Sequence, residues 1–359
     1  MVKFSLFSVL ECPPGRSARD VYREYADLCV YAESVGFHGA WVAEHHFSEY
    51  GTLGGPPVFL SSLAARTSKM RLGAAISVLP FHDPIRIAED YAVVDVISDG
   101  RLEFGAGRGY QPAEFAGFGV DMAEARGRFL ESLEIVKQAW YGGTVDHSGT
   151  FYTYKGIDVR PKPVQRRIPT YVASISPETF EMASQWGYGI MASLLTNSAK
   201  QINQGLSNFR ASLPVQRRYA QPIPILAPVY VADSMDAAFK DSMPGCQWYW
   251  ETVGKLLPKK GEKMDASYHY FQKLGEKTGG GSDDLVRTMS RWPIGDADYV
   301  AAFLTDLCLK STADEIICFA SLGAMPYAQA RANVERIARD VMPKLRRNLE
   351  AERKLAETA

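Results

Sequence analysis

The chain has no excess of charge of one sign and no long apolar run. Its 40 lysine and arginine residues are balanced by 41 aspartate and glutamate residues. A surface without a field of one sign has no general attraction for phosphate backbones or anionic lipid heads. No stretch approaches the roughly 20 apolar residues that a membrane-spanning helix needs. We therefore expect neither a nucleic-acid partner nor a membrane.

Cysteine is scarce and scattered, and the sequence has no Cys-x-x-Cys pair and no Cys/His cluster. Such a pattern disfavours zinc frameworks and disulfide scaffolds. The amino terminus also lacks a secretory pattern, because its short apolar run leads directly into Glu11 without a cleavage motif. We expect a cytoplasmic protein without a metal site. The five cysteines are Cys12, Cys29, Cys246, Cys308 and Cys318.

The motifs of common hydrolases are absent as well. The sequence contains no GxSxG nucleophile elbow, no HExxH and no pair of carboxylates at the ends of predicted strands. Hydrolysis therefore has little support.

Apolar segments of strand length alternate with segments of helical periodicity along most of the chain. Eight strands alternating with helices predict a closed parallel (β/α)₈ barrel, with a doubly wound sheet as the alternative. The predicted strands are 4–10, 39–44, 71–79, 101–107, 170–175, 188–193, 225–232 and 315–322. The clearest predicted helices are 18–35, 58–69, 85–97 and 123–140.

Two segments depart from this alternation. Between 142 and 169 the pattern predicts a short hairpin with strands at 150–154 and 157–160. The interval 243–291 fits no strand–helix unit and contains Trp248, Tyr249 and Trp250, so we expect a lid inserted after the seventh strand. The whole chain, 1–359, is expected to form one domain.

Barrel enzymes build their active sites at the carboxyl ends of the strands. The second predicted strand ends in Glu44-His45-His46. Adjacent imidazoles on a strand point to opposite faces, so they do not easily bind one metal together. An imidazole there suits general acid–base catalysis, because it titrates near neutral pH. A structural, hydrogen-bonded histidine is an equally good interpretation of the spacing.

The fourth predicted strand ends in a glycine-rich segment, Gly105 to Tyr110. It lacks the third glycine of the dinucleotide-binding fingerprint, so a Rossmann site is excluded. The glycines permit a ligand to approach the backbone closely, and the guanidinium of Arg108 suits a phosphate group. The alternative is a tight turn with a surface arginine.

Other candidates for ligand contacts carry weaker signals. Ser176 to Thr179 looks like a capped helix start, which can bind an anion, although most such starts bind none. Arg126, on the helix after strand four, is more commonly a solvated side chain. Aromatic residues are candidate pocket walls, although core packing is their commoner role. They include Phe7, Tyr110, Trp248 and Trp250.

Taken together, several ordered segments resemble the bacterial luciferase-like flavin monooxygenases. The segments that carry the resemblance are Trp41-Val42-Ala43-Glu44-His45-His46-Phe47, Glu49-Tyr50-Gly51, Arg71-Leu72-Gly73-Ala74-Ala75, Ser98-Asp99-Gly100-Arg101-Leu102-Glu103-Phe104-Gly105, Arg108-Gly109 and Phe118-Gly119-Val120-Asp121-Met122. The resemblance implies a (β/α)₈ barrel that binds FMN at its carboxyl-terminal mouth, often as a homodimer. It also implies that a separate flavin reductase supplies the reduced FMN.

The resemblance also implies roles for individual residues. His45 matches the catalytic histidine near the flavin ring, and Glu44 and Tyr110 are expected to help bind the cofactor. Ala74 and Ala75 match residues against the ring, where the family can hold a non-prolyl cis peptide. The matches to the phosphate contacts are Arg108, Arg126, Ser176 and Thr179. The chain departs from luciferase at Ile175, where luciferase carries a carboxylate.

The implied chemistry is the reaction of reduced FMN with dioxygen to give a flavin 4a-hydroperoxide, which oxygenates a small organic substrate. His45 would manage the proton in that reaction. One alternative keeps the fold and replaces FMN with a deazaflavin that transfers hydride without oxygen. Another is a flavin-binding protein without turnover. The substrate could be an aldehyde, alkane, sulfonate, amine or polyketide, and the sequence does not choose among them.

Overall fold

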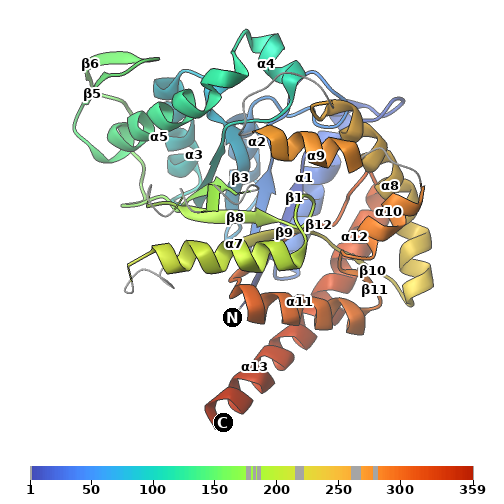
Figure 1. Cartoon of the computed structure of the whole chain (residues 1–359). Coiled ribbons are helices and arrows are strands. Elements are labelled where there is room, and N and C mark those ends of the chain that lie inside the picture. Colours follow the sequence, from blue (N-terminus) through green and yellow to red (C-terminus); the bar gives the residue numbers. More distant parts are fainter. Residues whose placement is uncertain are drawn as a thin grey trace.

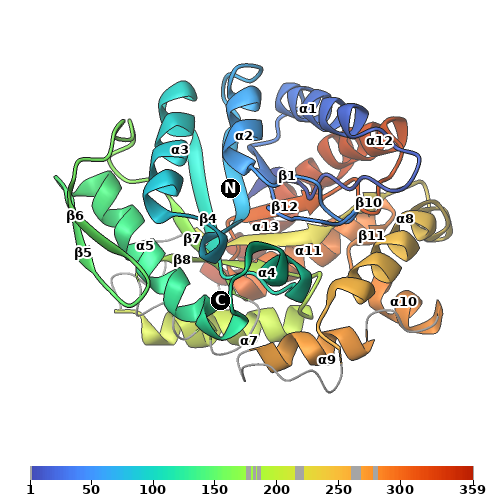
Figure 2. The ribbon, with the colours of Figure 1, turned by 90° about the horizontal axis from the view of Figure 1, so that it is seen from above.

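A closed barrel of parallel strands forms the centre of the molecule (Figures 1 and 2). The computed structural model describes residues 2–174, 179–180, 183, 187–214, 222–259, 268–277 and 282–358. The strands follow one another around the barrel in the order β1-β12-β9-β8-β7-β4-β3-β2. This confirms the predicted (β/α)₈ barrel. The barrel strands are β1 (Lys3–Ser8), β2 (Gly39–Val42), β3 (Arg71–Val78), β4 (Leu102–Gly107), β7 (Thr170–Ala173), β8 (Gly189–Ser193), β9 (Pro224–Pro228) and β12 (Glu315–Phe319).

Helices cover the outside of the barrel, as Figure 2 shows. They bury apolar faces against strands that are themselves almost entirely buried, which explains the continuous apolar runs in the sequence. The last helix, α13, extends away from the barrel and carries the carboxyl terminus of the chain (Figure 1). The outer helices are α1 (Ala18–Ser34), α2 (Pro56–Ala64), α3 (Pro84–Ile97), α5 (Ala125–Tyr141), α7 (Ala199–Ser212), α11 (Ala297–Ser311), α12 (Tyr327–Arg336) and α13 (Met342–Thr358).

Short helical turns join several of these elements. Their bounds are Leu79–Phe81 and Met122–Glu124 for two 3₁₀ turns and Ile337–Val341 for a π-helical turn between α12 and α13. None of the helices in the described part of the chain is long and apolar enough to cross a membrane.

The hairpin between α5 and β7 exists, but its predicted strands were misplaced. Strand β5 (Val145–Ser148) pairs antiparallel with β6 (Thr153–Ile157). The carboxylate of Glu131 on α5 accepts hydrogen bonds from the backbone N–H groups of Thr150 and Phe151. Because these groups are held by a side chain, the segment that we expected to be a strand forms the turn.

The seventh predicted strand, 225–232, is also divided in the structure. Strand β9 leaves the barrel at Pro228, and the next residues form β10 (Tyr230–Val231), which pairs with β11 (Ile294–Gly295) outside the barrel. The side chain of Asn333 stabilises the backbone where the two strands divide, because its Nδ2 donates to the carbonyl of Val229 and its Oδ1 accepts from the N–H of Val231.

The expected lid at 243–291 does not begin as a separate unit. Its first part continues α8 (Met235–Leu256), which starts earlier and passes through Pro244. A proline inside a helix normally ends it, so the sequence pattern hides this continuity. The rest of the described segment forms α9 (His269–Lys277) and α10 (Ser282–Met289). In Figure 2, α8, α9 and α10 lie together beside the barrel, after β9 and before α11.

One further helix, α4 (Pro112–Phe118), was not predicted and proves important for the site. It lies between β4 and α5. Pro112 occupies a first-turn position, and Gly119 ends the helix in the left-handed conformation at φ 66°. These two residues are the sequence signals that could have revealed it.

Candidate active site

The main cavity of the described structure opens at the carboxyl ends of the barrel strands, as expected for this fold. Residues from the strand ends form one wall, and residues from α8 and α9 form another. Those from the barrel side include Phe7, Val9, Ala43, Glu44, His45, Tyr50, Ala75, Ile76, Val78, Gly107, Arg108, Gly109, Tyr110, Glu114, Ala173, Thr179, Met191, Ala192, Ser193 and Leu226. Those from α8, α9 and nearby loops include Leu195, Thr196, Tyr249, Trp250, Val253, Leu257, Phe271 and Leu274.

His45 lines this cavity with only 7% of its surface exposed. Its Nδ1 lies 3.0 Å from Oε1 of Glu114 on α4. A carboxylate oxygen can only accept, so Nδ1 carries the proton in this pair and Nε2 is left as the nitrogen that can exchange one. The Gln111 side chain lies 3.1 Å from the same Nδ1. Its carbonyl and amide ends are interchangeable by a flip, and the carbonyl suits a protonated Nδ1.

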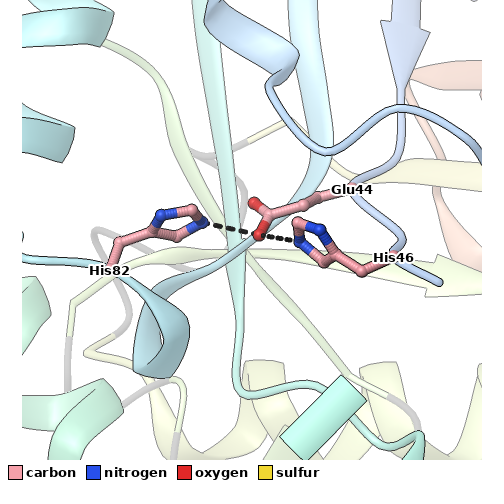
Figure 3. A group of neighbouring side chains, drawn as sticks. All are labelled: Glu44, His46 and His82. Atoms are coloured by element: carbon pink, nitrogen blue, oxygen red, sulfur yellow. Dashed lines mark hydrogen bonds and ion pairs between the residues drawn. The ribbon is translucent and has the colours of Figure 1, made fainter. Parts of the chain in front are cut away.

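The carboxylate of Glu44 connects two strand ends rather than projecting freely into the cavity (Figure 3). Its Oε1 accepts from Nε2 of His46 at 3.0 Å and from Nε2 of His82 at 2.6 Å. Its Oε2 accepts from the hydroxyl of Ser77 and the backbone N–H of Val78. Glu44 therefore fixes the end of β3 to the end of β2.

Burial and hydrogen bonding act in opposite directions on this cluster. Burial by itself would raise the pKa of the Glu44 carboxyl, but the hydrogen bonds from His46 and His82 outweigh it and lower that pKa below its usual value. Burial would likewise lower the pKa of His82, but the hydrogen bond to Glu44 and its charge raise it. These pKa shifts favour an ionised Glu44 carboxylate that is held by hydrogen-bond donors.

Among the described residues, Glu44, His46 and His82 are also placed closely enough to be candidate ligands of one metal ion. The ligand atoms of Glu44, His46 and His82 all lie within 4.8 Å of one another. Sequence reasoning expected no metal and considered only His45 with His46, which do face different partners. The hydrogen bonds of Glu44 already account for the arrangement of the three side chains.

The end of β3 passes beside the cavity. The peptide between Ala75 and Ile76 is cis and non-prolyl, as the resemblance implied for this segment. Both residues line the cavity, whereas Ala74 is fully buried and lies outside the lining. The backbone N–H of Glu44 donates to the carbonyl of Ile76, so β2 supports this segment directly.

The expected phosphate contacts divide into two groups. Arg108 and Thr179 line the cavity, and the Arg108 guanidinium lies 4.4 Å above the ring of Tyr268. Arg126 lies half-buried in the first turn of α5, outside the lining. Ser176 and Ile175 fall outside the described residues.

Aromatic side chains dominate the rest of the wall. Tyr110 stacks in parallel on Phe271 of α9, with ring centroids 4.9 Å apart. The ring of Tyr50 lies 4.8 Å from that of His45 and 5.8 Å from that of Tyr249. Of the aromatics predicted as pocket walls, Phe7, Tyr110 and Trp250 line the cavity, whereas Trp248 does not.

Sequence reasoning missed several residues that the structure brings to the site. Glu114 and Gln111 are fully buried against His45, and His82 completes the Glu44 cluster. The helix-start signal at Pro112 could have pointed to α4. It could not have shown that Glu114 reaches a histidine 69 positions earlier in the chain.

The sequence matches the family described as "Luciferase-like monooxygenase" over residues 2–316. It is 33% identical to the alkanal monooxygenase alpha chain of the Kryptophanaron alfredi symbiont over 56% of this chain and 57% of that protein. It is 30% identical to the oxygenase component of a flavin-dependent trigonelline monooxygenase from Acinetobacter baylyi, over 66% of this chain and 67% of that protein. The chain thus spans little more than half to two thirds of these curated relatives.

Solved structures agree with the sequence match. The monooxygenase RslO1 from Streptomyces bottropensis superposes with a TM-score of 0.82 at 26% identity, covering 95% of this chain and 99% of that one. The same fold, at 17–18% identity, occurs in a diketocamphane monooxygenase component in complex with FMN and in a coenzyme F420-dependent reductase from Methanopyrus kandleri. Their TM-scores are 0.77 and 0.69, and their coverage is 96% of this chain and 99% of each structure. With the family match covering nearly the whole barrel, this chain belongs to the luciferase-like monooxygenase family.

Proposed function

We propose that this protein is an FMN-dependent monooxygenase, which uses reduced FMN and dioxygen to oxygenate a small organic substrate through a flavin 4a-hydroperoxide. The observation that carries the proposal is the pairing of His45 with Glu114 inside a largely apolar cavity at the barrel mouth. Such a cavity excludes water from a reactive oxygen species while supplying one oriented acid–base group.

The residues present fit FMN. Ala75 presents a small side chain to the cavity, and at the neighbouring Gly107 the place that a Cβ would take is filled by the side chain of Ile76. The small residues Ala75, Gly107 and Gly109 in this lining allow a ring system to approach the ends of β3 and β4 closely. Arg108 and Thr179, on the same cavity, would hold the phosphate. The bound FMN would supply the redox chemistry.

His45 holds and moves the proton. Glu114 and Gln111 fix the orientation of its ring, so Nε2 can take a proton from the reacting oxygen or return it. Glu114 also accepts from the backbone N–H of His46 at 2.9 Å, so one carboxylate fixes both the ring and the loop that carries it.

We infer that electrons come from a separate flavin reductase, because one relative is the oxygenase component of its enzyme. We also propose a cytoplasmic location, which suits the five cysteines, all of them free.

The protein is proposed to act as a homodimer through α2 and α3. These helices lie side by side on the outside of the barrel, as Figure 2 shows. Both expose apolar side chains, namely Val58 at 78% on α2 and Val93, Val96 and Ile97 on α3, with Ile97 at 51%. The three residues of α3 share one face by their spacing. A second copy of this chain would cover that face.

Flavin binding tests the cofactor assignment. The protein should bind FMN more tightly than a deazaflavin in absorbance titrations, and Arg108→Ala should weaken FMN binding by roughly tenfold or more. The affinity for riboflavin, which has no phosphate, should not change in Arg108→Ala. Arg128→Ala is the matched control, since Arg128 pairs with Glu124 and Phe151 away from the cavity. Preference for the deazaflavin would replace the proposal with hydride transfer, and binding without oxygen consumption would leave a non-catalytic flavin carrier.

A further inference from the structure

We propose that the substrate is a neutral, largely apolar molecule, and that one of its oxygen atoms accepts a hydrogen bond from the indole N–H of Trp250. This inference rests on the proposed function, because it assigns the α8 and α9 side of the cavity to the substrate and the barrel side to FMN.

The charged groups of the cavity already have partners within the protein. Among the described lining residues these groups are Glu44, Glu114 and Arg108, together with His45. Glu44 is held by two histidines and two further donors, and Glu114 is held by His45 and the N–H of His46. Arg108 lies on the barrel side, where it is assigned to the phosphate. A charged substrate would lose its hydration without gaining an opposite charge, which is costly.

The wall opposite the barrel carries no charged side chain within the described lining. It includes Tyr249, Trp250 and Val253 from α8, Leu257 directly after it, and Phe271 and Leu274 from α9, with Leu195 and Thr196 from a nearby loop. The charged residues of this part of α8, Glu251 and Lys255, are exposed to solvent. An apolar substrate surface would therefore be removed from water against this wall.

Trp250 gives this wall a specific polar contact. Its side chain lines the cavity and is 7% exposed, yet its Nε1 is buried without a hydrogen-bond partner among the described residues. An unsatisfied buried donor is unfavourable, and tryptophan can only donate. A carbonyl, ether or hydroxyl oxygen on the substrate would satisfy it.

Naphthalene probes of one shape and different charge test the inference. The protein saturated with oxidised FMN is titrated with 2-acetylnaphthalene, 2-naphthoate and 2-naphthylmethylammonium, and tryptophan fluorescence is followed. We expect the neutral ketone to bind at least about tenfold more tightly than either ion, since burying an unpaired charge costs more than about 1.4 kcal/mol. Equal or tighter binding of naphthoate or of the ammonium probe would overturn the proposal.

The hydrogen bond is tested by comparing 2-acetylnaphthalene with 2-ethylnaphthalene, which has no acceptor. The ketone should bind about fivefold more tightly, and Trp250→Phe should abolish this difference. Trp248→Phe, two residues earlier on α8 and outside the lining, is the matched control and should preserve it. A difference that survives Trp250→Phe would contradict the assigned contact. These readouts need no turnover, so they can fail while FMN still supports oxygenation, and they can succeed if the flavin chemistry proves different.

Discussion

Nδ1 of His45 lies 3.0 Å from Oε1 of Glu114, and this contact joins the end of β2 to the short helix α4. Both side chains are almost completely buried, so the orientation of the imidazole is determined by the protein and not by solvent. A ring held in one tautomer presents the same nitrogen to every reacting molecule. The proposed proton transfer depends on this pair.

Replacing the imidazole should remove the proton transfer without removing the cofactor site. For His45→Ala we expect oxygenation to fall by about 10²- to 10⁴-fold, which is the usual contribution of general acid–base catalysis. FMN affinity should change little. The measurement is product formation, by mass spectrometry, from any substrate that the unaltered protein oxygenates. His269→Ala, at an exposed position on α9, should retain full activity. Full activity of His45→Ala would exclude the catalytic role.

Glu114→Gln tests whether the carboxylate positions His45. The N–H of His46 and Nδ1 of His45 both face Oε1, so an amide oxygen at that place can still accept from both, but it carries no negative charge to stabilise a doubly protonated ring during proton transfer. We expect kcat to fall by about tenfold, with KM and the thermal midpoint nearly unchanged. Glu114→Asp should restore part of the loss. Glu124→Gln, at a half-exposed carboxylate before α5, serves as the control. A parallel loss of kcat and thermal stability would indicate a purely structural role.

Glu11 should make stability depend on pH. Burial raises the pKa of its carboxyl from 4.5 to about 8, although the backbone N–H groups of Ala324 and Gly323 lower it in part. Because the folded pKa lies above the unfolded one, the folded state binds the proton more tightly. The resulting stability is complete below pH 4.5 and is lost as the pH rises toward 8.

The variant Glu11→Gln cannot titrate, so its free energy of unfolding should vary less with pH across this window. We expect the difference in free energy of unfolding between this variant and the unaltered protein to change by more than about 1 kcal/mol between pH 5 and pH 8. Urea unfolding at both pH values measures this difference. Glu24→Gln, in the half-buried pair with Arg16 nearby, provides the comparison. An identical pH slope in Glu11→Gln would show that Glu11 titrates normally.

The exposed apolar face of α3 predicts self-association. Ile97→Asp places a charge where a second copy would bury an apolar side chain, so it should shift a dimer toward monomer in sedimentation velocity. Leu309→Asp is a matched substitution on α11, at a residue that is 42% exposed, and should leave the dimer intact. Equal dissociation by both, or by neither, would place the interface elsewhere.

Sequence periodicity predicted the barrel because each strand is buried on both faces and each helix on one, and such patterns are local. His45, Arg108, Thr179 and Ala75 were predicted and do line the cavity. The hairpin strands were misplaced because a side chain on another element, Glu131, determines where the turn forms.

The contacts that complete the site could not be read from local patterns. Glu114, on α4, and His82, after β3, reach the segment at 44–46 from elsewhere in the chain, and only the closed barrel brings them together. Trp248 and Trp250 are only two residues apart, and the orientation of α8 about its axis decides which of them lines the cavity.

The most direct test of the proposed function is stopped-flow absorbance of the protein mixed anaerobically with reduced FMN and then exposed to dioxygen. We predict a long-lived species with the absorbance band of a flavin 4a-hydroperoxide, which decays slowly because the largely apolar cavity excludes water. Reoxidation at the rate of free reduced FMN, with no such species, would contradict the assignment of this protein as an FMN-dependent monooxygenase.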